Sequence, residues 1–183
     1  MRRFLTIRAR ERAREAFEAR ANASNCDDSI EVNAEIAQSD ARAAPMAVLL
    51  ETSKGDIVID LFVDDAPKTC LNFVKLCKMK YYNHCKFFDI QKDFMAQTGD
   101  PTGTGNGGES IYDGGKFKDE FHGRIRFTHR GLLGMASSGP DTNASQFFIT
   151  VAPEQTHLDD KYTIFGAVAE GLDVAQAIAA EYA

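Results

Sequence analysis

Apolar and polar residues alternate along much of the chain, which is the pattern of β-strands that bury one face. Residues 48–52 and 56–62 alternate on both sides of a short turn, with Ile57, Ile59 and Leu61 on one face, and predict an antiparallel hairpin. This rhythm of short strands and turns predicts a mainly β fold, a closed or nearly closed antiparallel barrel. The further predicted strands lie at 86–90, 94–98, 131–136, 146–151 and 162–168.

Two stretches carry the apolar period of helices. Residues 66–78 follow Asp64 and Asp65, which can act as an N-cap, and Pro67 stands in the first turn. A second helix is predicted from Leu172 to about residue 182. We expect it to plug one open end of the barrel.

The first 45 residues differ from the rest. Residues 1–20 are rich in Arg and Ala and carry a charge of +4, whereas residues 21–45 carry −4. The apolar stripe of a helix over 5–21 would be thin, so we interpret 1–45 as a disordered or weakly helical extension and 46–183 as the domain. An Arg-rich beginning can also direct import into mitochondria, although its three glutamates argue against that alternative.

Composition and charge narrow the class of protein. With 183 residues and 44% hydrophobic content, the chain is long enough for one core and too short for two ordinary domains. Residues 46–183 hold 13 Lys and Arg against 19 Asp and Glu, so we expect a neutral or basic peptide partner and no direct binding of nucleic acid. The basic strip RIRFTHR (124–130) is better interpreted as a solvent-facing strand with Ile125 and Phe127 packed inward.

The four cysteines form neither a C-x-x-C pair nor a dense framework, and no apolar signal segment opens the chain. Both observations favour a reducing intracellular compartment. Cys70 and Cys77 lie seven residues apart in the first predicted helix, so we interpret them as buried apolar residues. We expect no metal, no cofactor and no membrane span.

Glycines are concentrated in two stretches, FMAQTGDPTGTGNGG (94–108) and GLLGMASSGPDTNASQFFIT (131–150). Because glycine lets backbone pass where a side chain could not, the pair predicts a walled apolar groove. Residues 103–108 also satisfy the dinucleotide pattern G-x-G-x-x-G. No acidic residue follows at 121–140 and no helix is predicted directly after the loop, so we reject nucleotide binding.

Two blocks of the sequence resemble the signature blocks of the cyclophilins, a family of peptidyl-prolyl cis-trans isomerases: FMAQTGDPTGTGNGGESIY and MASSGPDTNASQFFIT. The resemblance runs from about residue 46 to about residue 181. Within the family, two segments are most similar to nuclear cyclophilins that carry an RNA-recognition domain after the isomerase domain: KYYNHCKFFDIQKDF (80–94) and QTGDPTGTG (97–105). The resemblance implies an eight-stranded barrel capped by two helices, whose last strand would follow Ala183. We therefore expect an unpaired sheet edge.

The resemblance also implies a site. Phe94, Met95, Phe148 and Leu158 match the proline pocket, and Gln97 matches the amide that contacts the substrate carbonyl. Without the family pattern these would be interpreted as core residues. The remaining matched substrate-binding positions are Gly105, Ala136, Ser137, Gln146, His157 and Tyr162.

Four positions depart from the family. Asp89 stands where active members have the arginine that donates to the prolyl nitrogen, and Ser137, His157 and Tyr162 replace asparagine, tryptophan and histidine. A carboxylate cannot donate a hydrogen bond when ionised, so we expect weakened turnover unless Arg124 or Arg126 substitutes. We also expect weak or no cyclosporin binding.

The sequence therefore predicts a peptidyl-prolyl cis-trans isomerase domain that binds proline-containing peptides, with a nuclear location and splicing-complex partners. The alternative is a non-catalytic proline-peptide binding module in an RNA-protein assembly.

Overall fold

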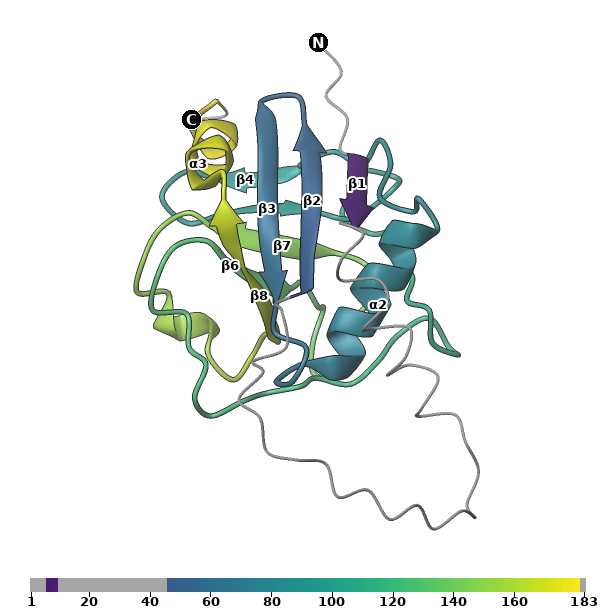
Figure 1. Ribbon diagram of the computed structural model, residues 1–183. Coiled ribbons are helices and arrows are strands. Elements are labelled where there is room, and N and C mark those ends of the chain that lie inside the picture. The colour runs from purple at the N-terminus through teal and green to yellow at the C-terminus, as the bar shows by residue number, and fades with distance from the viewer. Residues whose placement is uncertain (1–5, 10–45, 182–183) are drawn as a thin grey trace, which may run out of the picture.

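The computed structural model describes residues 6–9 and 46–181, and in them a strongly curled antiparallel sheet is flanked by two α-helices (Figure 1). Eight strands pair in the order β1-β2-β3-β8-β6-β7-β5-β4. A 3₁₀ turn, η2 (Thr156–Leu158), precedes β8. The strands are β1 (Thr6–Ala9), β2 (Met46–Thr52), β3 (Gly55–Leu61), β4 (Asp89–Gln91), β5 (Met95–Thr98), β6 (Leu132–Met135), β7 (Phe147–Thr150) and β8 (Ile164–Glu170).

The sequence pattern predicted β2 to β8 but not β1. β2 buries alternate residues, whereas β6 and β7 are buried on both faces. β2 and β3 form the expected hairpin, from the pair Met46↔Leu61 to the pair Thr52↔Gly55, and the apolar face of β3 is buried. The predicted strand at 124–130 is wrong. That segment is irregular, although Phe127 is fully buried as expected.

The curl of the sheet leaves β1 and β4 as its two edges. In the described part of the chain no pairing joins them, so the sheet is a half-barrel and does not close. β1 pairs with β2 in the register Thr6↔Glu51 to Ala9↔Val48, so the outer edge of β2 is covered by backbone from residues 6–9. This strand lies within the extension predicted to be disordered or weakly helical, and the rest of that prediction falls outside the described residues.

The two helices, α2 (Pro67–Lys78) and α3 (Leu172–Ala180), lie at opposite ends of the curled sheet (Figure 1). α2 begins at Pro67, but its predicted N-cap is wrong: no side chain at the cap position bonds to the helix. Instead the Glu120 carboxylate accepts hydrogen bonds from the backbone N–H of Lys68 at 3.1 Å and of Thr69 at 2.8 Å. A residue distant in sequence thus satisfies the free N–H groups of the first turn.

The three cysteines in the described residues, Cys70, Cys77 and Cys85, are buried and free, and for Cys70 and Cys77 the helical spacing predicted this burial. Burial raises the pKa of the Cys70 and Cys77 thiols far above the ordinary value, and raises that of Cys85 to about 11. These thiols therefore pack as small apolar groups. None of the helices in the described part of the chain has the length and apolar character needed to cross a membrane.

Two apolar clusters lie on the two faces of the sheet. Because neighbouring strand residues point to opposite faces, Phe147 and Ile149 of β7 join the larger cluster with α2 and α3, whereas Phe148 joins the smaller one. In the same way Ala96 of β5 enters the large cluster and Met95 enters the small one. Among the described residues neither α2 nor α3 contributes to the small cluster, and a groove opens above it.

Candidate active site

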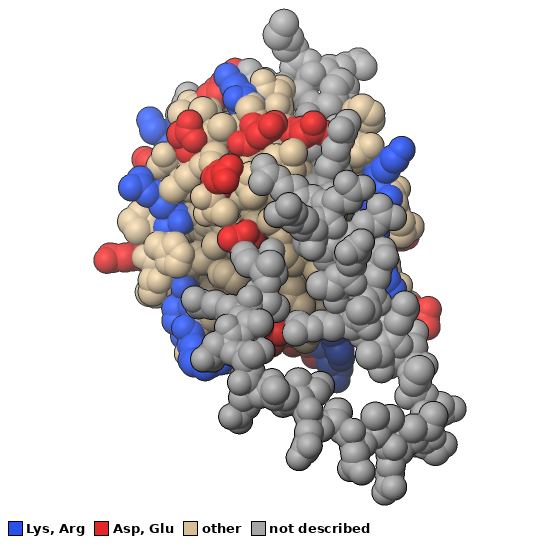
Figure 2. Space-filling model, in the orientation of Figure 1, with Lys and Arg blue, Asp and Glu red and all other residues tan. Residues whose placement is uncertain are grey.

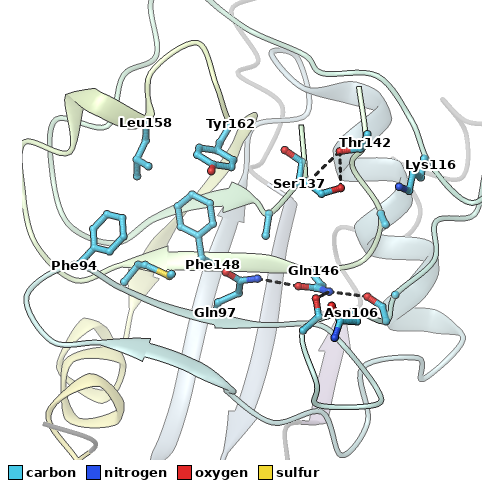
Figure 3. A pocket seen from close by; sticks show the side chains of 17 residues that line it. Phe94, Gln97, Asn106, Lys116, Ser137, Thr142, Gln146, Phe148, Leu158 and Tyr162 are labelled. Carbon is cyan, nitrogen blue, oxygen red and sulfur yellow. Dashed lines mark hydrogen bonds between the residues drawn. The ribbon is translucent and has the colours of Figure 1, made fainter. Parts of the chain in front are cut away.

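A groove of about 380 Å³ opens above the small apolar cluster, between β5, β7 and the loops around residues 105–108 and 136–144 (Figure 3). Ten of the twelve site residues predicted from the sequence line it, so segments up to 68 residues apart in the chain (94 to 162) meet here. Asp89 and His157 do not line it. The ten are Phe94, Met95, Gln97, Gly105, Ala136, Ser137, Gln146, Phe148, Leu158 and Tyr162.

One end of the groove is apolar and is held in shape by ring contacts. The Phe148 ring stacks on Phe127, with centroids 5.8 Å apart, and meets Tyr162 edge-on at 5.6 Å. Phe94 and Leu158 stand opposite these rings, as Figure 3 shows. His157 is exposed outside the groove, but its ring packs against Phe94 at 5.4 Å. His157 thus supports the wall without forming it, and this end can receive a small apolar ring.

The middle of the groove is polar and ordered by two amides. Gln97 Nε2 donates to Gln146 Oε1 at 2.8 Å, and Gln146 Nε2 donates to the carbonyl oxygens of Gly105 at 3.0 Å and Gly107 at 2.6 Å. These bonds fix the orientation of both side chains (Figure 3). An amide nitrogen carries two hydrogens, so one N–H of Gln97 is left to donate to a ligand carbonyl.

Asp100 holds the glycine-rich wall of the groove from beneath. Its buried carboxylate accepts hydrogen bonds from the backbone N–H of Thr102 at 2.8 Å, Gly105 at 2.7 Å and Gly107 at 3.2 Å, and from the Thr102 hydroxyl at 2.8 Å. Burial by itself raises the pKa of Asp100, but these bonds outweigh it and lower the pKa from 3.8 to about 2. The G-x-G-x-x-G pattern at 103–108 therefore belongs to a loop that folds around the Asp100 carboxylate.

Two glycines are required by close approach. A Cβ on Gly134 of β6 would collide with the tip of the Phe148 ring, and a Cβ on Gly107 would collide with Asp100 Oδ1. Gly134 pairs directly with Phe148 across the β6–β7 ladder, so the ring lies flat over the glycine backbone. The groove floor thus depends on the absence of a side chain.

The cations suggested from the sequence do not reach the groove. Arg126 pairs with Asp160 at 2.6 Å, and Arg124 lies 3.9 Å from Asp65. Of the described residues that line the groove only Lys116 is charged, and sequence reasoning missed it. The lining includes no His, Cys, Asp or Glu, so it offers none of these metal ligands.

The family model described as "Cyclophilin type peptidyl-prolyl cis-trans isomerase/CLD" matches residues 47–182, which include every lining residue of the groove. The chain belongs to this cyclophilin family.

Individual cyclophilins are similar to this one over most of the matched region. Peptidyl-prolyl cis-trans isomerase 10 of Caenorhabditis elegans is 56% identical over 133 residues, 73% of this chain and 81% of the relative. Peptidyl-prolyl cis-trans isomerase CYP59 of Arabidopsis thaliana is 54% identical over 134 residues, which are 70% of this chain but only 26% of that longer protein. A crystal structure of a Cryptosporidium parvum cyclophilin in the presence of the dipeptide Ala-Pro has a TM-score of 0.70 and 41% identity, covering 73% of this chain and 85% of the other.

Several lining residues of this cyclophilin were not predicted from its sequence. Asn106 lies in the glycine-rich stretch 94–108 that predicted a groove wall, so the loop pattern could have indicated it. Lys116 and Thr142 come from irregular segments that carry no periodic signal. Only the folded chain brings them to the groove.

Proposed function

We propose that this cyclophilin binds proline-containing peptides in the groove and isomerises the bond before proline slowly. Its membership of the isomerase family supports the reaction type. The observation that carries the proposal is the meeting of Phe94, Phe148 and Leu158 at one apolar end beside the Gln97 amide. A proline ring fits the apolar end, and the amide can hold the neighbouring carbonyl.

The reaction needs no bond cleavage. Rotation about the bond before proline crosses a barrier of about 18 to 20 kcal/mol, because the planar amide loses its resonance as it twists. A catalyst must seat the ring, hold the carbonyl and donate to the nitrogen that becomes pyramidal. In the groove Gln97 supplies a hydrogen-bond donor for the carbonyl. The donor for the prolyl nitrogen is the one that this chain lacks at the family position.

Asp89 is the reason to expect slow turnover. It begins β4 and pairs with Gln97 of β5, so residue 89 is on the groove face of the hairpin. The family resemblance assigns an arginine to this position, and an ionised carboxylate accepts hydrogen bonds but cannot donate them. Loss of one transition-state donor costs about 3 to 4 kcal/mol, or two to three decades of rate.

The substitution Asp89→Arg tests this explanation. We expect it to raise the exchange rate between cis and trans signals of an Ala-Pro peptide by about 100-fold in nuclear magnetic resonance spectra, with little change in peptide affinity. Asp56→Arg is the matched control, because Asp56 is an exposed strand residue that does not line the groove and the charge change is the same. A wild-type rate already equal to that of fully active cyclophilins would refute slow turnover.

The second candidate function is a recognition module that holds a proline-containing partner without turnover. Asp89 favours it, since the apolar end is retained while the donor is replaced. The Asp89→Arg experiment also distinguishes slow isomerisation from binding without turnover. If Asp89→Arg binds the peptide as before and still fails to accelerate exchange, the groove is shaped for binding alone.

We further propose a nuclear protein that acts in splicing complexes and resembles the cyclophilins followed by an RNA-recognition domain. The support is the likeness of residues 80–105 to that subgroup. A tagged chain that stayed outside the nucleus would contradict the location, and absence of splicing proteins after affinity purification from nuclear extract would contradict the partners.

Weak cyclosporin binding is also proposed, because His157 packs beside Phe94 with less apolar area than an indole. We expect His157→Trp to tighten cyclosporin about tenfold, measured by calorimetric titration. Equal affinity in both proteins would contradict this reason.

A further inference from the structure

The Asp89 carboxylate has a defined place beside the groove. Asp89 lies directly opposite Gln97 in the β4–β5 ladder. Residues directly opposite one another in an antiparallel pair point to the same face, with Cβ atoms about 5 Å apart. Because Gln97 lines the groove, the half-buried side chain of Asp89 lies at its rim, next to the amide that would hold the peptide.

This carboxylate is oriented but not neutralised by the protein. Gln91, two residues along the same strand and therefore on the same face, donates through Nε2 to its two oxygens at 3.2 and 3.4 Å. Within the described part of the chain, Asp89 takes part in no ion pair. The negative charge is therefore available to a ligand.

The charge of the groove is divided along its length. Lys116 lies at the end marked by Ser137 and Thr142, away from Phe94 and Leu158, as Figure 3 shows. Gln97, and with it the Asp89 rim, lies nearer the apolar end. A positive side chain close to the bound proline would thus meet Asp89, whereas the same charge farther along the groove would meet Lys116.

We propose that Asp89 selects proline peptides with a lysine or arginine adjacent to the proline. The inference rests on the proposed function and adds a substrate class to it. Long basic side chains can reach across a strand pair, and their charge complements a rim carboxylate. Asp89 acts here as a specificity residue, whatever the turnover of the groove.

The test uses the whole chain and a set of short Ala-rich peptides with one proline. Lys, Gln or Glu is placed directly before or directly after the proline, and affinities are measured by nuclear magnetic resonance titration at low salt. For at least one of the two positions we expect the Lys peptide to bind about three- to tenfold tighter than the Glu peptide, with Gln between them. The preference should shrink in 1 M salt, where screening acts within about 3 Å.

Two variants assign the preference to this carboxylate. Asp89→Asn should abolish the order of Lys over Glu while leaving the affinity of the Gln peptide within about twofold. Asp93→Asn removes the same charge from the exposed β4–β5 turn and should leave the order intact; Asp93 has a φ of 59°, which asparagine tolerates.

The outcomes separate this inference from the proposed function. If the Gln peptide binds but peptide charge has no effect, or if the preference survives in Asp89→Asn, the specificity role is overturned and the groove keeps its proposed function. If no proline peptide binds at any salt concentration, the proposed function itself fails.

Discussion

Asp100 shows how one residue can determine the shape of a binding wall. The chain reverses several times between residues 100 and 108, and a buried carboxylate satisfies the backbone N–H groups that those turns leave free. Gln146 holds the same loop from the other side through two carbonyl oxygens. The loop is therefore fixed before a peptide arrives, which reduces the entropy lost on binding.

The low pKa of Asp100 gives a prediction about acid stability. Because the folded-state pKa of about 2 lies below the ordinary 3.8, Asp100 stabilises the fold above about pH 4, and this contribution disappears as the pH falls toward 2. The difference between 3.8 and about 2 corresponds to about 2.5 kcal/mol. We expect Asp100→Asn to lose about that much at pH 7 in urea unfolding and to weaken peptide binding.

The control for this prediction is Asp93→Asn, which changes an exposed carboxyl group. Its stability should match the wild type throughout. The explanation fails if Asp100→Asn shows the same loss of stability between pH 4 and pH 2 as the wild type.

At the scale of elements, the contact of β6 with β7 sets the floor of the groove. Gly134→Ala would place a methyl group against the Phe148 ring, and overpacking of this kind costs about 1 to 3 kcal/mol. We expect lower thermal stability, a displaced Phe148 ring and weaker peptide binding. Calorimetry and aromatic ring chemical shifts would measure these effects.

Gly123→Ala is the matched control, since no atom lies within 4 Å of the added methyl group. In the double variant Gly134→Ala, Phe148→Leu the stability loss caused by the alanine should become smaller, because the collision is with the ring. An unchanged loss would show that the cost arises elsewhere in β6.

At the scale of the whole molecule, the covered sheet edge affects association. β1 pairs with β2 through backbone groups, and proline has no N–H to donate. The double substitution Ile7→Pro, Arg8→Pro should therefore release β1 from β2. We expect faster hydrogen exchange of the β2 amides, and edge-to-edge association of the exposed strand, which would be measured as concentration-dependent sedimentation. The variant Ile7→Ala, Arg8→Ala keeps both N–H groups and should behave as the wild type; equal exchange in both variants would contradict the pairing.

Charge is also a property of the whole molecule. Acidic side chains gather on the upper part of the face that carries β2 and β3, and basic ones lie along its margins (Figure 2). Together with the net charge of −6, this distribution supports a neutral or basic peptide partner over phosphate backbone.

The sequence by itself determined strands β2 to β8, both helices and most of the groove. Alternation is a local property, so the buried faces of β2 and β3 could be recognised without coordinates. The two glycine-rich stretches likewise marked the loops that form the walls, and the cyclophilin resemblance connected them into one site. The placement of Phe94, Gln97 and Phe148 around that site was predicted in this way, and in the structure all three line the same groove.

Only the tertiary structure decided the positions of charged residues on irregular segments. Arg124 and Arg126 turn to carboxylates outside the groove, Lys116 enters it, and Glu120 caps a helix 51 residues earlier in the chain. β1 also finds its place beside β2 only through long-range pairing. Such contacts depend on where separate segments meet in space, and a long polar side chain has no periodic pattern that reveals its partner.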